Sequence, residues 1–350
     1  MLSHSVAVGY HSWFSLSGPE QDVVLSSRVR LERNLSGFLF YHRLDDEGKM
    51  KLRRHIETVF SQLDERFVVV DGDTVSDDVF RCYRERGILH VDDRTAVALV
   101  SEAEDRVIRI GPHEHVSHES YAGGLDLFGA FDRATEFDQR LENRLDFAVS
   151  LDRGYLSSDV MNAGTGLSAS LMVHLPGLYQ TGALPVVISD LDSGVVTLHQ
   201  YGAQEQSMAH LYAVSVPPQT GRGERELLME LEAYGQALVH YERAARADVF
   251  SAHRSDLAEA AHRALGTLRH ARRIDLNEAL ELIDLLRFVV ASGEDVEGLS
   301  IKAIDALLFH VQPGQVAVLS RTEGDTLDSE EEKRAALVRQ SLNRYFAQGD

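Results

Sequence analysis

The pattern of apolar residues changes near residue 251, and this change limits the folds open to the chain. Before it, short runs rich in β-branched residues alternate with segments whose apolar residues recur at helical spacing. After it, only helical spacing is found. This order predicts an α+β fold, in which a mostly antiparallel sheet flanked by helices is followed by an all-helical region. We expect one domain over residues 1–250 and a second over residues 251–350.

The same patterns predict the individual elements. The expected strands lie at residues 67–70, 96–100, 107–110, 171–175, 186–188 and 211–216, and the expected helices at about 50–66, 125–150, 224–247, 275–291, 300–311 and 329–346. Asp275 and Glu278 have the spacing of a capping box, which predicts where one helix begins. Ser292 and Gly293 are expected to end that helix.

Net charge and cysteine content narrow the class of protein. The formal charge of −20 at pH 7 argues against a general binder of nucleic acid or of anionic membranes, because either needs a basic face. Cys82 is the only cysteine, so no intramolecular disulfide can form, as is usual in a reducing compartment. Neither a signal peptide nor an apolar stretch approaching the ~20 residues of a membrane span is visible. We expect a cytoplasmic protein.

The run Ser26-Ser-Arg28-Val-Arg30 carries the clearest chemical signal. Two arginines two residues apart on an extended segment project from the same face. Each guanidinium makes forked, charge-assisted hydrogen bonds to phosphate, so the pair can clamp a polyphosphate. The run therefore predicts a phosphate-binding strand. Surface ion pairs with some of the many acidic residues are the alternative.

This run resembles the Ser-Ser-Arg-Val-Arg signature of the ATP:guanidino phosphotransferases. Gly154-Tyr-Leu-Ser-Ser, Asn162-Ala-Gly-Thr-Gly-Leu-Ser-Ala-Ser170 and His174-Leu-Pro176 resemble further stretches of that family in the same order. The layout, with a short segment before the arginine pair and a helical region at the end, is similar to that of the bacterial protein arginine kinases. The resemblance implies ATP with Mg²⁺, arginine-containing protein substrates, a homodimer and a link to Clp-type proteolysis.

Part of the chemistry that the resemblance implies is missing from the phosphate side of the site. The family holds the nucleotide phosphates with five arginines. Arg28, Arg30 and Arg109 match three of them, whereas the other two correspond to Ser168 and Leu198. As an alternative, Arg109 is only a salt-bridge partner on the face of its strand. With two of five arginines absent, we expect weak ATP binding.

The acceptor side of the implied site is altered as well. Asp105 corresponds to one catalytic glutamate of the family, Ala203 to the other, and Asp159 to its reactive cysteine. Glu205 takes the second glutamate's place if the alignment slips by two residues. Losing a positioned arginine costs phosphoryl transfer about 10³–10⁵ in rate, and losing a general base about 10²–10⁴. We therefore expect a pseudokinase or regulatory module linked to protein quality control; an active protein arginine kinase is the alternative.

Two further groups of residues admit more than one interpretation. His113, His115 and His118 would suit a metal site, but a polar surface loop is the simpler interpretation, and we expect no metal there. Trp13 and Phe14 are expected to pack in the interior rather than to stack on a ligand.

Two features of the C-terminal region concern partners. The family's Arg-Asp-x-x-Arg-Ala motif, which binds phosphoarginine, corresponds to Glu330-Glu-Glu-Lys-Arg334-Ala335. Three glutamates repel a phosphate, so that pocket is expected to be lost. An apolar stripe in the helix at 275–291 is expected to be covered in part by a second copy of the chain, which would give the homodimer. The stripe consists of Leu282, Leu285, Leu286 and Val289.

Overall fold

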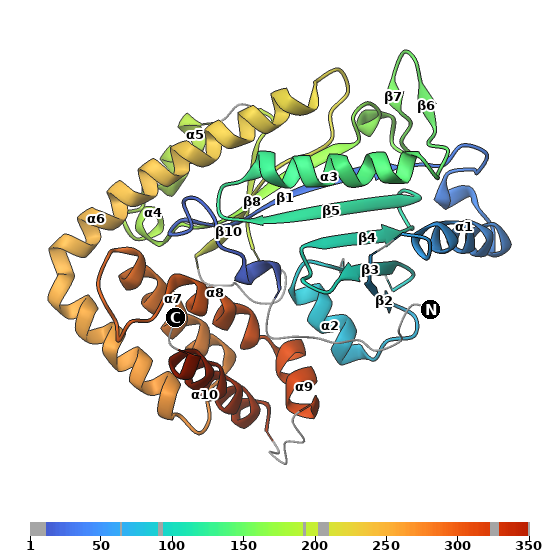
Figure 1. The fold of residues 1–350 in the computed structure, drawn as a ribbon. Helices are drawn as coiled ribbons and strands as arrows, with labels where there is room; N and C mark the ends of the chain where they lie inside the picture. The colour runs from blue at the N-terminus through green and yellow to red at the C-terminus, as the bar shows by residue number, and fades with distance from the viewer. Residues whose placement is uncertain are drawn as a thin grey trace.

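An eight-stranded antiparallel sheet forms the centre of the molecule (Figure 1). The computed structural model describes residues 12–63, 65–89, 94–191, 194–201, 210–322 and 329–348. The strand order is β2-β3-β4-β5-β1-β8-β10-β9, so the strand with the arginine pair, β1, lies in the middle. The bounds are β1 Val24–Arg33, β2 Phe67–Asp71, β3 Val97–Ser101, β4 Arg106–Ile110, β5 Val116–Gly123, β8 Leu167–His174, β9 Thr197–Gln200 and β10 Leu211–Val216. The expected α+β class with a mostly antiparallel sheet is confirmed.

Helices cover both faces of the sheet. One face packs on α3 and on the first part of α6, through apolar side chains of β1, β8 and β10. The other face packs on α2, η1 and the C-terminal helices, which share one continuous apolar cluster with it. The helices are η1 Trp13–Ser15, η2 Tyr41–Arg43, α1 Asp46–Phe60, α2 Asp77–Glu85, α3 Leu127–Glu142, η3 Val160–Asn162, α4 Pro176–Gln180, α5 Leu184–Asp190, α6 Glu224–His270, α7 Leu276–Ala291, α8 Ile301–His310, α9 Pro313–Thr322 and α10 Glu330–Gln348. A hairpin of β6 (Val149–Ser150) and β7 (Gly154–Tyr155) stands apart from the sheet (Figure 1).

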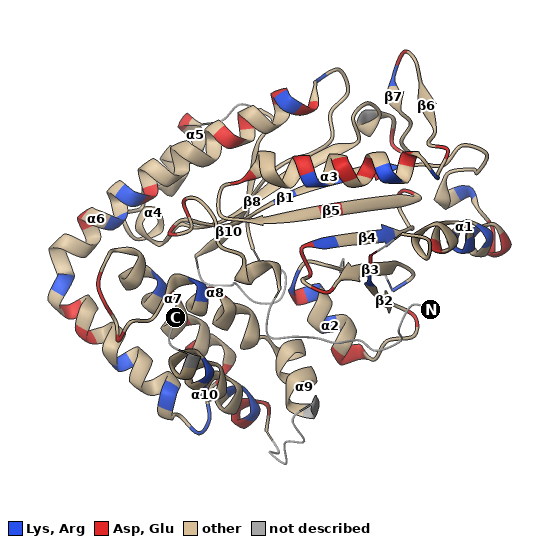
Figure 2. Ribbon diagram, in the orientation of Figure 1, with Lys and Arg blue, Asp and Glu red and all other residues tan. Residues whose placement is uncertain are grey.

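The alternation of side chains along β1 decides which face carries the arginines. Val29 and Leu31 belong to the apolar cluster under α3 and α6. Arg28 and Arg30, at the intervening positions, therefore project toward the opposite face. Figure 2 shows both signs of charge along α3 and α6 but no charged residue along β8 or β10. Strands β8 and β10 therefore add no charge beside the two arginines of β1.

Two local predictions were wrong. Residues 186–188, predicted as a strand, lie in helix α5. Short apolar runs fit a strand or a helix equally well, and the proline near the start of α5 favours a helix. The helix expected at 125–150 ends at Glu142, and Val149 already belongs to β6.

The C-terminal helices pack against the sheet domain within the same chain. Helix α6 continues through residue 250, and its non-helical backbone angles occur at His253. The division into two domains at residue 250 therefore stays a prediction. Leu286 and Val289 are fully buried, and Leu282 and Leu285 pack on the same cluster, so the chain itself covers the predicted dimer stripe. The stripe therefore gives no evidence for a homodimer, which remains a prediction. No helix in the described ranges is both long and apolar enough to cross a membrane.

Candidate functional site

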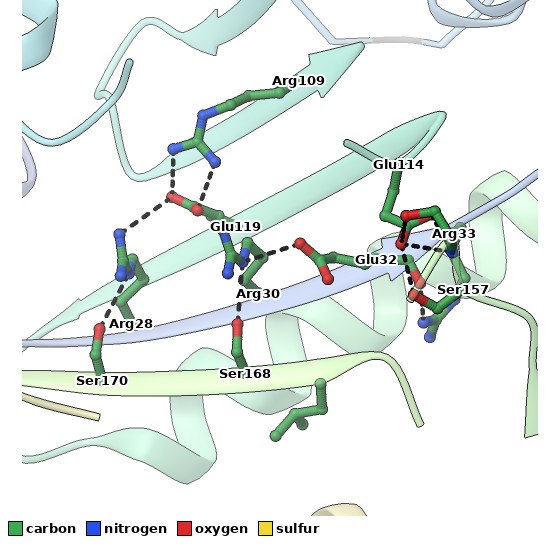
Figure 3. Close-up of polar contacts among 12 residues, drawn as sticks. Arg28, Arg30, Glu32, Arg33, Arg109, Glu114, Glu119, Ser157, Ser168 and Ser170 are labelled. Atoms are coloured by element: carbon green, nitrogen blue, oxygen red, sulfur yellow. Dashed lines mark hydrogen bonds and ion pairs between the residues drawn. The ribbon is translucent and has the colours of Figure 1, made fainter. Parts of the chain in front are cut away.

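The arginine pair of β1 is held from one side by two serines of β8. The antiparallel register places Arg28 opposite Ser170 and Arg30 opposite Ser168. Each arginine donates its Nε–H to the hydroxyl oxygen of the serine opposite, over 3.0 Å in both cases (Figure 3). The side chains of Arg28 and Arg30 remain 31% and 24% exposed. The structure thus presents two guanidinium groups side by side on one face.

A buried carboxylate that we did not single out from the sequence lies on the other side of the pair. Glu119 of β5 is opposite Arg30 in the register and is fully buried. Its Oε1 accepts from Arg109 Nη1 at 2.6 Å and its Oε2 from Arg109 Nη2 at 3.0 Å (Figure 3). Oε2 also lies 3.9 Å from Arg28 Nη1 and accepts from the hydroxyl of Tyr121 at 2.9 Å.

These contacts keep Glu119 ionised. Burial by itself would raise its pKa, but Arg109, Arg28 and Arg30 together lower the pKa far below the ordinary value of a glutamate. The sequence held one indication that Glu119 matters, namely that it is an acidic residue inside an otherwise uncharged strand-like run. That signal became informative only once β5 was known to pair with β1.

Arg109 is not presented to solvent beside Arg28 and Arg30. It lies on β4, with β5 between it and the arginine strand. Besides its fork on Glu119, it donates from Nε to the carbonyl oxygen of Ile88 at 2.7 Å, and its side chain is 3% exposed. Arg109 is therefore the buried partner of a carboxylate, which corresponds to the alternative interpretation of this residue.

The other predicted positions of the phosphate and acceptor sites do not converge on the arginine pair. Asp105 lies in the turn between β3 and β4, where it accepts from the Ser101 hydroxyl at 2.8 Å. Asp159 is exposed in the loop before η3, and its backbone N–H donates to the Ser157 hydroxyl at 3.2 Å. Ala203 and Glu205 lie outside the described residues.

Leu198 lies on the wrong face of the sheet for a phosphate-binding arginine. It packs on the apolar cluster under α3 and α6. Its neighbour Thr197 points the other way, with its hydroxyl 3.0 Å from that of Ser215, the residue opposite Ser170. An arginine directed at the phosphate face would have to stand at position 197 or 199.

This geometry predicts the outcome of two adjacent substitutions. Leu198→Arg should lower the free energy of unfolding by about 1–3 kcal/mol, because it places a guanidinium against an apolar cluster. His199→Arg, on the opposite, exposed face, should change it by no more than about 0.5 kcal/mol. Urea denaturation of both variants measures the difference, and equal stabilities would contradict the assigned register of β9.

Little space remains beside Arg28. A cavity of about 60 Å³ is lined by Arg28, Trp13, Tyr121, Tyr201, Ser170 and Met172, among others. Trp13 is buried and stacks on Tyr121, with the ring centroids 5.4 Å apart, and Phe14 stacks on Phe309 of α8 at 4.5 Å. The prediction that Trp13 and Phe14 pack in the interior is confirmed. This volume is below the about 300–1,000 Å³ of typical ligand pockets.

Comparisons with known proteins show which family the chain belongs to. The model of the ATP:guanido phosphotransferase C-terminal catalytic domain matches residues 46–245. The chain belongs to this family. The model of the protein-arginine kinase McsB C-terminal domain matches residues 254–349.

Relatives in this family match the chain over nearly its whole length. It is 30% identical over 364 residues to the protein-arginine kinase of Desulforamulus reducens, with 98% of each chain covered. It is 28% identical over 352 residues to that of Bacillus subtilis, covering 98% of this chain and 96% of the relative.

Solved structures of more distant members support the fold alone. The taurocyamine kinase from Schistosoma mansoni aligns with a TM-score of 0.56 at 21% identity, over 69% of this chain and 36% of the other. Lombricine kinase aligns with a TM-score of 0.55 at 18% identity, over 70% and 71% of the two chains.

The segment that corresponds to the family's phosphoarginine motif is closed by internal contacts. Arg334 is 2% exposed and donates to the carbonyl oxygens of Val311 at 2.8 Å and Ile274 at 3.2 Å. Its remaining terminal nitrogen pairs with Glu330, which stands at the position of the motif's first arginine. The guanidinium is therefore used within the chain.

The three histidines considered for a metal do not share a site. His115 accepts from the backbone N–H of Leu35 at 2.9 Å, and its other ring nitrogen contacts the carbonyl of Leu39. His118 contacts Asp138 at 2.9 Å, whereas His113 is exposed. His115 lies just before β5 and its ring is held between Leu35 and Leu39, whereas His118 lies on β5 and its ring contacts Asp138 of α3.

A different trio brings potential metal ligands together. Ligand atoms of His174, His210 and Asp284 all lie within 4.8 Å of one another. However, Arg287 donates to Nδ1 of His174 at 2.9 Å, so the proton of this imidazole is on Nε2, where it is donated to Asp284 at 2.7 Å. That proton and the adjacent guanidinium disfavour a cation. The trio is better described as a hydrogen-bonded network between β8 and α7.

Proposed function

We propose that this member of the guanidino phosphotransferase family is a pseudokinase, or a kinase of greatly reduced turnover, that acts as a binding or regulatory module. The observation that carries the proposal is the composition of the phosphate-facing side. In the described part of the chain, Arg28 and Arg30 are partly exposed and bonded to two serines, and Arg109 is committed to Glu119. Phosphoryl transfer depends on charge neutralisation and positioning, which two arginines supply only in part.

The pairing of β5 with β1 supports a second alignment of this chain with the family. In that alignment one more of the family's five arginines has no counterpart here. The family's Asn-Glu-Glu-Asp-His-Leu-Arg run can be matched to residues 111–117 instead of the segment that contains Arg109. Glu114-His115-Val116 then matches Asp-His-Leu, and the family's arginine falls on Ser117, next to Glu32 of β1. In this alignment His113 replaces the catalytic glutamate, and only Arg28 and Arg30 remain of the five arginines.

The carboxylate next to the replaced glutamate, Glu114, does not take over its role. Glu114 is 6% exposed and accepts from the Ser157 hydroxyl at 2.6 Å, from the Ser158 backbone N–H at 3.0 Å and from the side-chain amide of Asn34. Figure 3 shows this group at the end of β1 away from Arg28. A carboxylate that already accepts several hydrogen bonds is poorly placed to orient a guanidinium acceptor.

An active protein arginine kinase is the second candidate. It is favoured by the named relatives, which match the chain over nearly their full length, and by the exposure of Arg28 and Arg30. In this case ATP and Mg²⁺ are the cofactors. The homodimer, the arginine-containing substrates and the link to Clp-type proteolysis remain predictions under either candidate.

The two candidates differ in one assay. Incubated with Mg-ATP and casein, the purified chain should incorporate at least about 10³-fold less acid-labile phosphate than the Bacillus subtilis protein-arginine kinase used as a positive control. Mass spectrometry for phosphoarginine checks the product. Incorporation comparable to the control, abolished by Arg28→Ala, would overturn the pseudokinase proposal and establish the active kinase.

A further inference from the structure

We propose that Glu119 is an internal counter-anion that sets the selectivity of the Arg28–Arg30 pair by limiting the gain in affinity for polyphosphates over small anions. This inference rests on the proposed function and names the residue responsible for it. The family match assigns no role to this position, and the argument comes from the contacts of the carboxylate.

The position of Glu119 gives it influence over the whole arginine group. It is buried beside the two partly exposed guanidinium groups, opposite Arg30 in the register and 3.9 Å from Arg28 Nη1 (Figure 3). A residue that served only to neutralise Arg109 would need no contact with β1. Instead, one carboxylate bonds to Arg109 and lies in the field of both members of the pair.

The local charge determines which anions the site accepts. Arg28, Arg30 and Arg109 supply three positive charges, and Glu119 and Glu32 supply two negative ones, with Glu32 Oε1 3.5 Å from Arg30 Nε. One positive charge therefore remains. A triphosphate brings several negative charges to a place where a buried carboxylate repels each of them at low effective dielectric. A small anion of low charge can bind, whereas each added phosphate group increases the affinity only slightly.

Neutralising Glu119 tests the inference directly. Glu119→Gln keeps the side-chain shape and one oxygen that accepts from Arg109, and its amide N–H can donate to the hydroxyl oxygen of Tyr121. It removes the charge and one of the two hydrogen bonds from Arg109. Calorimetry with inorganic tripolyphosphate should show binding at least about tenfold tighter than for the unmodified chain, with the gain shrinking as salt is raised. The matched control is Glu136→Gln, which makes the same change of net charge on the exposed side of α3, across the sheet.

A double variant separates local charge from altered packing. Glu119→Gln combined with Arg109→Gln removes one charge of each sign and restores the original local balance. Its affinity for tripolyphosphate should return to within about threefold of the unmodified chain, because the field at the pair depends on the summed charge. A double variant that keeps the full gain would overturn the electrostatic inference.

A third measurement needs no variant, so it holds even where Glu119→Gln does not fold. In the unmodified chain, tripolyphosphate should bind no more than about tenfold tighter than inorganic phosphate. A preference above about 100-fold would overturn the inference.

The two proposals fail in different ways. If Glu119→Gln binds tripolyphosphate no better than Glu136→Gln, the counter-anion inference is wrong while the pseudokinase proposal stands. Phosphorylation of casein by the unmodified chain overturns the proposed function, whatever the tripolyphosphate results.

Discussion

Replacing Arg287 by methionine is expected to lower the free energy of unfolding by about 3–5 kcal/mol, because it leaves a buried carboxylate without its counter-charge. Arg287 of α7 is fully buried and donates from Nε to Asp305 of α8 at 2.6 Å. Asp305 is 1% exposed, and burial already raises its pKa even with the arginine present. The same guanidinium also bonds His174 and the carbonyl oxygens of Gln21 and Asp22, so it connects the helical region to the sheet.

Two control variants test whether the effect of Arg287→Met comes from leaving the Asp305 charge buried. Arg254→Met removes an exposed partner of Glu294, and should cost no more than about 1 kcal/mol. Arg287→Met combined with Asp305→Asn should recover part of the loss, because no charge is then left buried. Urea denaturation at neutral pH measures all three variants. A loss below about 1 kcal/mol for Arg287→Met would mean that Asp305 is not left uncompensated.

The second large effect is a loss of stability in mild acid caused by His174. Burial and then the charge of Arg287 lower the pKa of His174 from its ordinary 6.5 to about 4. Between these two values the unfolded chain binds a proton at this imidazole and the folded chain does not. The free energy of unfolding therefore falls as the pH drops from 6.5 to about 4, by roughly 3 kcal/mol from this residue.

Comparison of variants isolates the contribution of His174. His174→Gln removes the titrating group, so its stability should fall by roughly 3 kcal/mol less than that of the unmodified chain between pH 6.5 and pH 4. His262→Gln, at an exposed position on α6, serves as the control and should keep the original pH dependence. Urea denaturation across this range gives both curves. Parallel curves for the unmodified chain and His174→Gln would show that the imidazole titrates normally in the folded state.

Features that depend on neighbours along the chain were predictable from the sequence. Period-two alternation in β1 placed Arg28 and Arg30 on one face, opposite to the buried Val29 and Leu31. The helix start at Asp275 was predicted as well, and that carboxylate accepts from the backbone N–H groups of residues 277 and 278. Alternation and capping are local, since each depends on residues at most four positions apart.

What lies across from a residue in the folded sheet depends on strand order and register, which local patterns do not contain. The sequence alone determined the sheet-and-helix class, the family and the shared face of Arg28 and Arg30. Only the tertiary structure placed Glu119 among the arginines, turned Arg109 into its buried partner and packed Leu198 against the apolar cluster under α3 and α6. The physical reason is that a carboxylate acts on charges within a few ångströms of it, and its neighbours here come from strands that pair only when the sheet forms.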